Sequence, residues 1–79
     1  MQKITTGKYR HYKGQDYEVI GVGIHTETRE KMVIYQALYP TPELTEEYGE
    51  EPFFIRPYSQ FVETIEINGE FMPRFKKVY

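Results

Sequence analysis

Apolar and polar residues alternate along much of this chain, in short runs that are separated by polar turns and by Gly or Pro residues. A period of two places successive side chains on opposite faces of a β-strand, and the frequent Val, Ile, Tyr and Phe residues suit half-buried pleated surfaces. Turn residues mark the ends of each run. The pattern predicts five or six strands, within residues 8–12, 17–25, 31–39, 53–56, 62–67 and 70–75.

The second of these strands contains a change in the alternation. Tyr17 and Val19 lie on one face, whereas the apolar residues from Ile20 onward fall on the other. Such a change of phase predicts a β-bulge or a sharp bend near Val19–Gly21. This strand and residues 31–39 form the longest neighbouring pair, and we expect them to make one bent hairpin.

The remaining connections differ in length. Asn68 and Gly69 both tolerate the positive φ of a type I′ turn and predict a tight hairpin. Residues 57–61 have room for one 3₁₀ turn. Residues 40–52 contain three prolines and five glutamates, and we expect a flexible acidic loop with at most one helical turn at residues 43–48.

This order of strands and turns predicts an all-β fold, a small SH3-like barrel of five to six antiparallel strands with one 3₁₀ turn. An OB-like barrel is the alternative, although it usually has a longer helix between its third and fourth strands. Pro73 lacks an N–H group, so the last strand should lie at an edge or end there. The 79 residues are enough for one domain, 1–79, with an ordered core at about 7–75.

Composition limits the chemistry available to the chain. Cysteine is absent, and the two histidines, His11 and His25, show no metal-ligand spacing, so we expect no metal or cofactor. His25 is expected to bond the backbone of the turn that follows it. No apolar run approaches the ~20 residues of a membrane span, and we expect a cytoplasmic protein with no membrane partner.

Charge is distributed unevenly around a net value of −2. Acidic residues are absent from the first fifteen and the last nine positions, and they crowd residues 43–51. If the two basic ends meet on one face, that face could bind a polyanion; the alternative is ordinary charge for solubility. The basic residues of the ends are Lys3, Lys8, Arg10, Lys13, Arg74, Lys76 and Lys77.

No catalytic motif is present, and we expect a binding module rather than an enzyme. A protein or peptide is the favoured partner because the chain is net acidic; a nucleic-acid-binding SH3-like domain and a small oligomerising accessory domain, a homodimer paired through residues 71–75, are alternatives. The candidate ligand-binding residues form an aromatic and basic face, to which Tyr39 also belongs: Tyr9, Arg10, His11, Tyr35, Arg56, Tyr58 and Arg74.

Glu63 raises a question of pairing. On a regular strand it shares a face with Ile65, and an inward carboxylate needs a cationic partner. Arg56 and Arg74 are the candidates. The sequence leaves open whether Arg56 forms this structural pair or presents its guanidinium to a ligand.

Several blocks of the chain resemble the bacterial domain-of-unknown-function family 1653. They cover nearly the whole sequence in order: Gly7–Gly14, His25–Thr28, Val33–Tyr39, Phe54–Pro57, Phe61, Glu63, Gly69 and Pro73–Phe75. Phe54 stands where members of that family often have Trp, and residues 40–52 are longer than usual. The resemblance implies a small bacterial β domain and assigns no activity.

Overall fold

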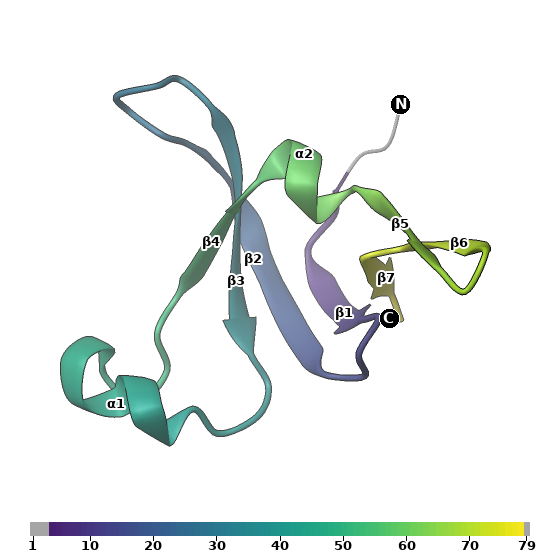
Figure 1. The fold of residues 1–79 in the computed structure, drawn as a ribbon. Helices are drawn as coiled ribbons and strands as arrows, with labels where there is room; N and C mark the ends of the chain where they lie inside the picture. The colour runs from purple at the N-terminus through teal and green to yellow at the C-terminus, as the bar shows by residue number, and fades with distance from the viewer. Residues whose placement is uncertain (1–3, 79) are drawn as a thin grey trace.

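The computed structural model describes residues 4–78, which form seven short strands and two short helices (Figure 1). In chain order these elements are β1 Gly7–His11, β2 Asp16–Ile24, β3 Lys31–Ala37, α1 Pro42–Tyr48, β4 Phe54–Pro57, α2 Tyr58–Phe61, β5 Thr64–Ile67, β6 Glu70–Pro73 and β7 Phe75–Lys77.

Five strands make one antiparallel sheet in the order β4-β3-β2-β1-β7, and β5 and β6 pair only with each other. The expected all-β character is therefore confirmed in its broad form, with 48% of the described residues in strands. Strand pairing within residues 4–78 does not close a barrel, because β4 and β7 lie at opposite edges of the sheet. The edge strand β4 has only four residues, because the chain passes from Pro57 directly into α2.

Two local predictions are confirmed. The register of β2 against β3 shifts between Val19 and Gly21, which is the expected β-bulge. Asn68 and Gly69 have φ values of 52° and 82°, as a type I′ turn between β5 and β6 requires. The bulge bends the longest hairpin, so that the inner side chains of β1, β2 and β3 converge.

Three segments differ from the prediction. The acidic segment contains the seven-residue helix α1, which Pro42 and Glu43 favour as first-turn residues. Residues 70–75 are not one strand, because β6 ends at Pro73 and the chain bends before it forms β7. Residues 58–61 form a short helix, α2, where a 3₁₀ turn was predicted.

The core is a cluster of aromatic rings with two valines on the inner face of the sheet. Its buried members are Tyr9, Tyr17, Val19, Val33, Tyr35, Phe61 and Phe75. The rings of Phe61, from α2, and Phe75, from β7, stack with centroids 4.1 Å apart and planes 4° apart. The helix α1 buries no residue and projects from the sheet as a separate arm (Figure 1).

We predict that Phe61→Ala lowers the free energy of unfolding by about 3–5 kcal/mol, because it removes a fully buried ring and leaves a cavity. Urea unfolding followed by tyrosine fluorescence measures the loss. The matched control is Phe71→Ala, since Phe71 is 74% exposed and its loss should cost under about 0.5 kcal/mol. Equal effects of the two substitutions would contradict this account of the core.

Candidate functional site

Three basic side chains gather at the edge of the core, around the ring of Phe75. We call His11, Arg56 and Arg74 the cationic cluster. His11 belongs to β1, Arg56 to β4 and Arg74 to the bend between β6 and β7, so residues distant in the sequence meet here. The imidazole of His11 lies 4.9 Å from Phe75 between ring centroids, and the guanidinium carbon of Arg56 lies 5.5 Å from the same ring.

Arg56 is half-buried and carries an unneutralised charge. Its Nε donates a hydrogen bond to the hydroxyl of Tyr35 at 3.2 Å, and the guanidinium lies over Phe75. It forms no ion pair with any acidic side chain of residues 4–78. A planar guanidinium fixed in this way can offer its remaining N–H groups to a carboxylate or a phosphate.

The structure identifies the cationic partner of Glu63, which the sequence left open. Nη2 of Arg74 lies 3.4 Å from Oε1 of Glu63, so Arg74, and not Arg56, is the partner of that carboxylate. The pair is partly exposed, with side-chain exposures of 24% and 44%. The Nε of Arg74 is buried and has no hydrogen-bond partner within the described chain. Arg56 is thereby left available to a ligand.

His11 supplies a third group whose charge depends on its surroundings. Its Nδ1 accepts a hydrogen bond from the backbone N–H of Lys13 at 3.2 Å. Partial burial, followed by the charges of Arg56, Arg74 and Lys13, lowers the pKa of His11 below its usual value. The ring is therefore neutral at pH 7, with its proton on Nε2. An anion bound nearby would favour the imidazolium and raise that pKa.

A pair of tyrosine hydroxyls lies next to the cluster. Tyr17 and Tyr39 share a hydrogen bond of 2.8 Å, and Tyr17 packs edge-on against Tyr35 and Phe75. Burial, with the hydrogen bond shared with Tyr39, raises the pKa of Tyr17, so the hydroxyl of Tyr17 stays neutral. Tyr17 was missed as a site residue, because its alternation with Val19 only marks it as core. The sequence did offer one signal: a buried Tyr, unlike a buried Phe, has a hydroxyl that usually needs a hydrogen-bond partner.

The candidate residues predicted from the sequence are separated by the fold. His11, Tyr35, Arg56 and Arg74 come together, although Tyr35 is itself a core residue. Tyr9 is also buried, because it alternates onto the inner face of β1, so neither tyrosine belongs to an exposed aromatic face as predicted. The remaining two candidates lie elsewhere.

Tyr58 is half-buried at the other end of the core. Its hydroxyl accepts a hydrogen bond from the N–H of Ile4 at 3.3 Å, and Nζ of Lys31 lies 4.0 Å from its ring centroid. Arg10 points to the outer face of β1, where its Nε lies 2.8 Å from Oδ1 of Asp16. Neither side chain belongs to the cationic cluster.

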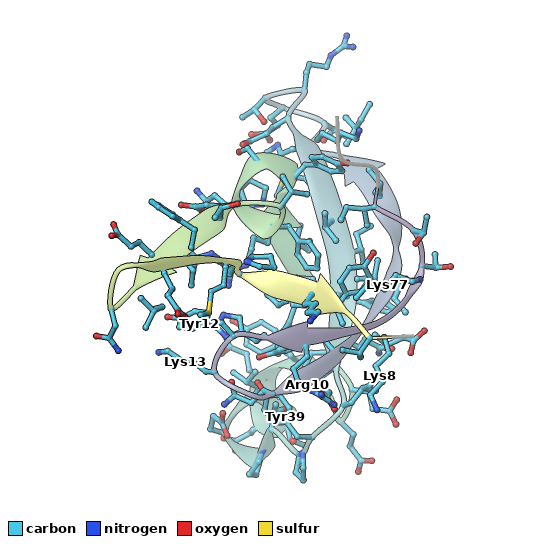
Figure 2. The ribbon with its side chains drawn as sticks, turned by 90° about the vertical axis from the view of Figure 1, so that its right-hand side faces the viewer. Lys8, Arg10, Tyr12, Lys13, Tyr39 and Lys77 are labelled. Atoms are coloured by element: carbon cyan, nitrogen blue, oxygen red, sulfur yellow. The ribbon has the colours of Figure 1, made fainter. Side chains whose placement is uncertain are left out.

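The two basic ends of the chain meet, because β7 pairs with β1. Arg10 stands opposite Lys76, and Lys77 stands opposite Tyr9. Figure 2 shows Lys8, Arg10, Lys13 and Lys77 along the same side of the molecule, over β1 and β7. Lys3, the remaining basic residue of the N-terminal segment, lies outside the described residues.

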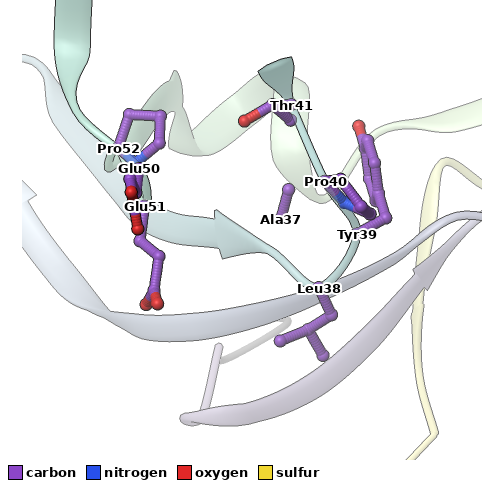
Figure 3. Close-up of a pocket in the computed structure, with 8 residues that line it drawn as sticks. All are labelled: Ala37, Leu38, Tyr39, Pro40, Thr41, Glu50, Glu51 and Pro52. Atoms are coloured by element: carbon purple, nitrogen blue, oxygen red, sulfur yellow. The ribbon is translucent and has the colours of Figure 1, made fainter. Parts of the chain in front are cut away.

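The acidic side of the molecule offers a different environment. An open hollow of about 410 Å³ lies between the end of β3 and the segment after α1, lined in part by Tyr39, Glu50 and Glu51 (Figure 3). Gln36 donates to the carbonyl of Glu51 at 2.9 Å and holds that segment against β3. Residues 4–78 contain no group of three His, Cys, Asp or Glu side chains that could hold a metal ion.

Two further observations concern the rest of the chain. His25 behaves as predicted, since its Nδ1 accepts hydrogen bonds from the N–H groups of Glu27 and Thr28, both at 3.3 Å. In the part of the chain described, α1 and α2 are too short to cross a bilayer.

Comparison with known proteins decides the family. The model of the family described as "Protein of unknown function (DUF1653)" matches residues 7–77. The chain belongs to the DUF1653 family. The crystal structure of a DUF1653 protein from Bordetella bronchiseptica is 35% identical, with a TM-score of 0.82 over 99% of this chain and 91% of that one. No curated protein matches this DUF1653 chain. The resemblance seen in the sequence is confirmed, and the family carries no assigned function.

We predict that Arg56→Gln raises the pKa of His11 toward its usual value, because it removes the first of the nearby charges that oppose the imidazolium. An NMR pH titration of the His11 ring measures the change. Arg29→Gln, on the exposed β2–β3 hairpin, is the control and should leave the His11 titration unaltered. An unchanged pKa in the Arg56 variant would mean that the two side chains do not share a site.

Proposed function

We propose that this DUF1653 chain is a non-catalytic, cytoplasmic binding module that recognises an acidic segment of a protein or peptide at the cationic cluster. One observation supports this above all: Arg56 is half-buried and fixed by Tyr35 and Phe75, yet has no carboxylate partner within residues 4–78. A desolvated cation without a counter-charge is costly, and a ligand carboxylate would offset that cost.

The surrounding groups suit a carboxylate. The guanidinium of Arg56 is planar and can bind both oxygens of a carboxylate. His11 donates through Nε2 when neutral and adds charge when protonated. The edges of Tyr39 and of the core rings would pack against the apolar part of the peptide, since Tyr39 is 36% exposed.

The fold is compatible with this role. We propose that the bent sheet is an SH3-like barrel that stays open between β4 and β7, with α2 and the β5–β6 hairpin in the intervening space. Its support is the bulged β2–β3 hairpin and the short helical turn before the last strands. An opening on the inner side of the sheet would leave the cationic cluster accessible at its rim.

We expect an oligoglutamate peptide to bind the ¹⁵N-labelled protein at low salt, with amide shifts at His11, Arg56 and Arg74. Affinity should rise as the pH falls through the ordinary histidine pKa of about 6.5, because binding favours the imidazolium. Arg56→Gln should weaken binding by about tenfold or more, since hydrogen bonds to charged groups are worth about 1.5–3 kcal/mol.

Two variants control this experiment. Arg56→Lys keeps the charge but loses the planar donor pair, so an intermediate loss indicates a bidentate contact. Arg29→Gln removes an equal charge on the distant hairpin and should leave affinity unchanged. Equal shifts with an oligoglutamine peptide, or an Arg56 variant that binds as well as the parent, would rule the proposal out.

A further inference from the structure

The β1–β7 edge carries positively charged residues at directly opposite positions on the two strands. Arg10 and Lys76 are cross-strand partners and point to the same face of the sheet. Lys8 precedes Arg10 by two residues on β1, so its side chain lies on that face as well. Like charges placed opposite one another destabilise a strand pair. Asp16 offsets two of these charges, at 2.8 Å from Arg10 and 3.6 Å from Lys8, and Glu18 stands opposite Lys8 on β2. No ion pair within residues 4–78 involves Lys76.

An open hollow lies beside these cations. Its volume is about 400 Å³, and it is formed where the β1–β2 turn approaches the end of β6 and β7. Met72, Pro73 and Val78 give it apolar walls, and Arg10 and Lys76 contribute positive charge to its lining. The hollow is therefore apolar inside with cations on one side.

Two aromatic rings form another wall of the hollow. His11 and Tyr12 lie with ring centroids 4.5 Å apart and planes tilted by 35°. Nζ of Lys13 lies 5.8 Å from the centroid of Tyr12, so a further cation stands over that ring. In Figure 2 the labelled residues Tyr12 and Lys13 continue the line of Arg10 and Lys8 along β1.

We propose that this edge binds a short single-stranded nucleic acid, with one base in the hollow against Tyr12 and its phosphates on Arg10, Lys76 and Lys8. Stacking on an aromatic side chain beside a positively charged groove is the common physical basis of single-strand binding. A duplex keeps its bases stacked and paired, so it could not place one in the hollow. Lys8 and Arg10 are about 7 Å apart along the strand, which suits successive phosphates of an extended strand.

The favoured ligand follows from the combination of groups. An acidic peptide would neutralise the cations but has no flat ring for the apolar, aromatic hollow. Five of the twelve acidic residues lie on α1 or directly after it, and α1 lies away from β1 and β7 (Figure 1). The negative charges of this arm therefore do not oppose an anion at the β1–β7 edge. This surface shares His11 with the cationic cluster but includes neither Arg56 nor Arg74, and the proposal does not depend on the proposed function.

The test is fluorescence anisotropy of a fluorescein-labelled oligothymidylate of about ten nucleotides, a usual site size for a small β domain. We expect saturable binding whose logarithm falls linearly with the logarithm of salt concentration. Lys76→Gln should weaken binding and reduce the magnitude of that slope by about 0.7, the value for one phosphate contact on a single strand. Tyr12→Ala should weaken binding by at least about fivefold through lost stacking.

Matched variants keep the result interpretable. Tyr48→Ala makes the same substitution on the exposed arm and should not change affinity. Tyr12→Phe should retain binding, because it keeps the ring, and it separates stacking from a loss of folding. Arg56→Gln should leave oligonucleotide affinity intact while it weakens peptide binding by about tenfold or more, so the two proposals succeed or fail separately.

Three outcomes would overturn the proposal. A salt slope near zero, or a slope that Lys76→Gln leaves unaltered, would show that the lysines only protect an edge strand from pairing with another sheet. Stronger binding of a duplex of the same length would exclude a base in the hollow. Loss of oligonucleotide binding in Arg56→Gln but not in Lys76→Gln would move the ligand to the cationic cluster.

Discussion

The ring of Phe75 connects the core of this protein to its candidate site. One face of the ring stacks on Phe61, which attaches α2 to the sheet. His11 meets it edge-on, and Arg56 places its guanidinium within 5.5 Å of its centroid. Because β7 has only three residues, this buried side chain is its main apolar anchor. The same packing that holds the last strand in the sheet therefore also sets the positions of two members of the cationic cluster.

Much of the fold could be predicted from alternation and turn chemistry. The bulge in β2 follows from a change of phase at Val19, and the β5–β6 hairpin follows from the φ preferences of Asn68 and Gly69. These are local properties, which the residues themselves determine. The pairing of β7 with β1 is not local, because it joins residues more than sixty positions apart, and no pattern within Phe75–Lys77 names its partner. Closure of the sheet depends on such long-range pairing, so the sequence could not show that β4 and β7 stay unpaired with each other.

The candidate site also combines local features that the sequence shows with long-range contacts that it does not show. Arg56, Arg74 and His11 were recognised as chemically notable residues, but their meeting point depends on the long-range arrangement of β1, β4 and the bend before β7. Tyr35 was placed on an exposed face, since the sequence cannot tell which face of a strand with apolar residues on both sides is buried. The partner of Glu63 was equally undetermined, and the choice of Arg74 depends on the backbone hydrogen bond from the N–H of Arg74 to the carbonyl of Glu63, at 2.9 Å.

The arm formed by α1 has a practical consequence for work on this protein. It buries none of its own residues, and its two ends return to β3 and β4, which are neighbours in the sheet. The entropy of closing such a connection grows only slowly with its length, so the sheet tolerates a longer, shorter or different segment here. The arm is thus a natural position for a fluorophore, an affinity tag or an inserted domain, because it reports on the molecule without disturbing either the aromatic core or the β1–β7 edge.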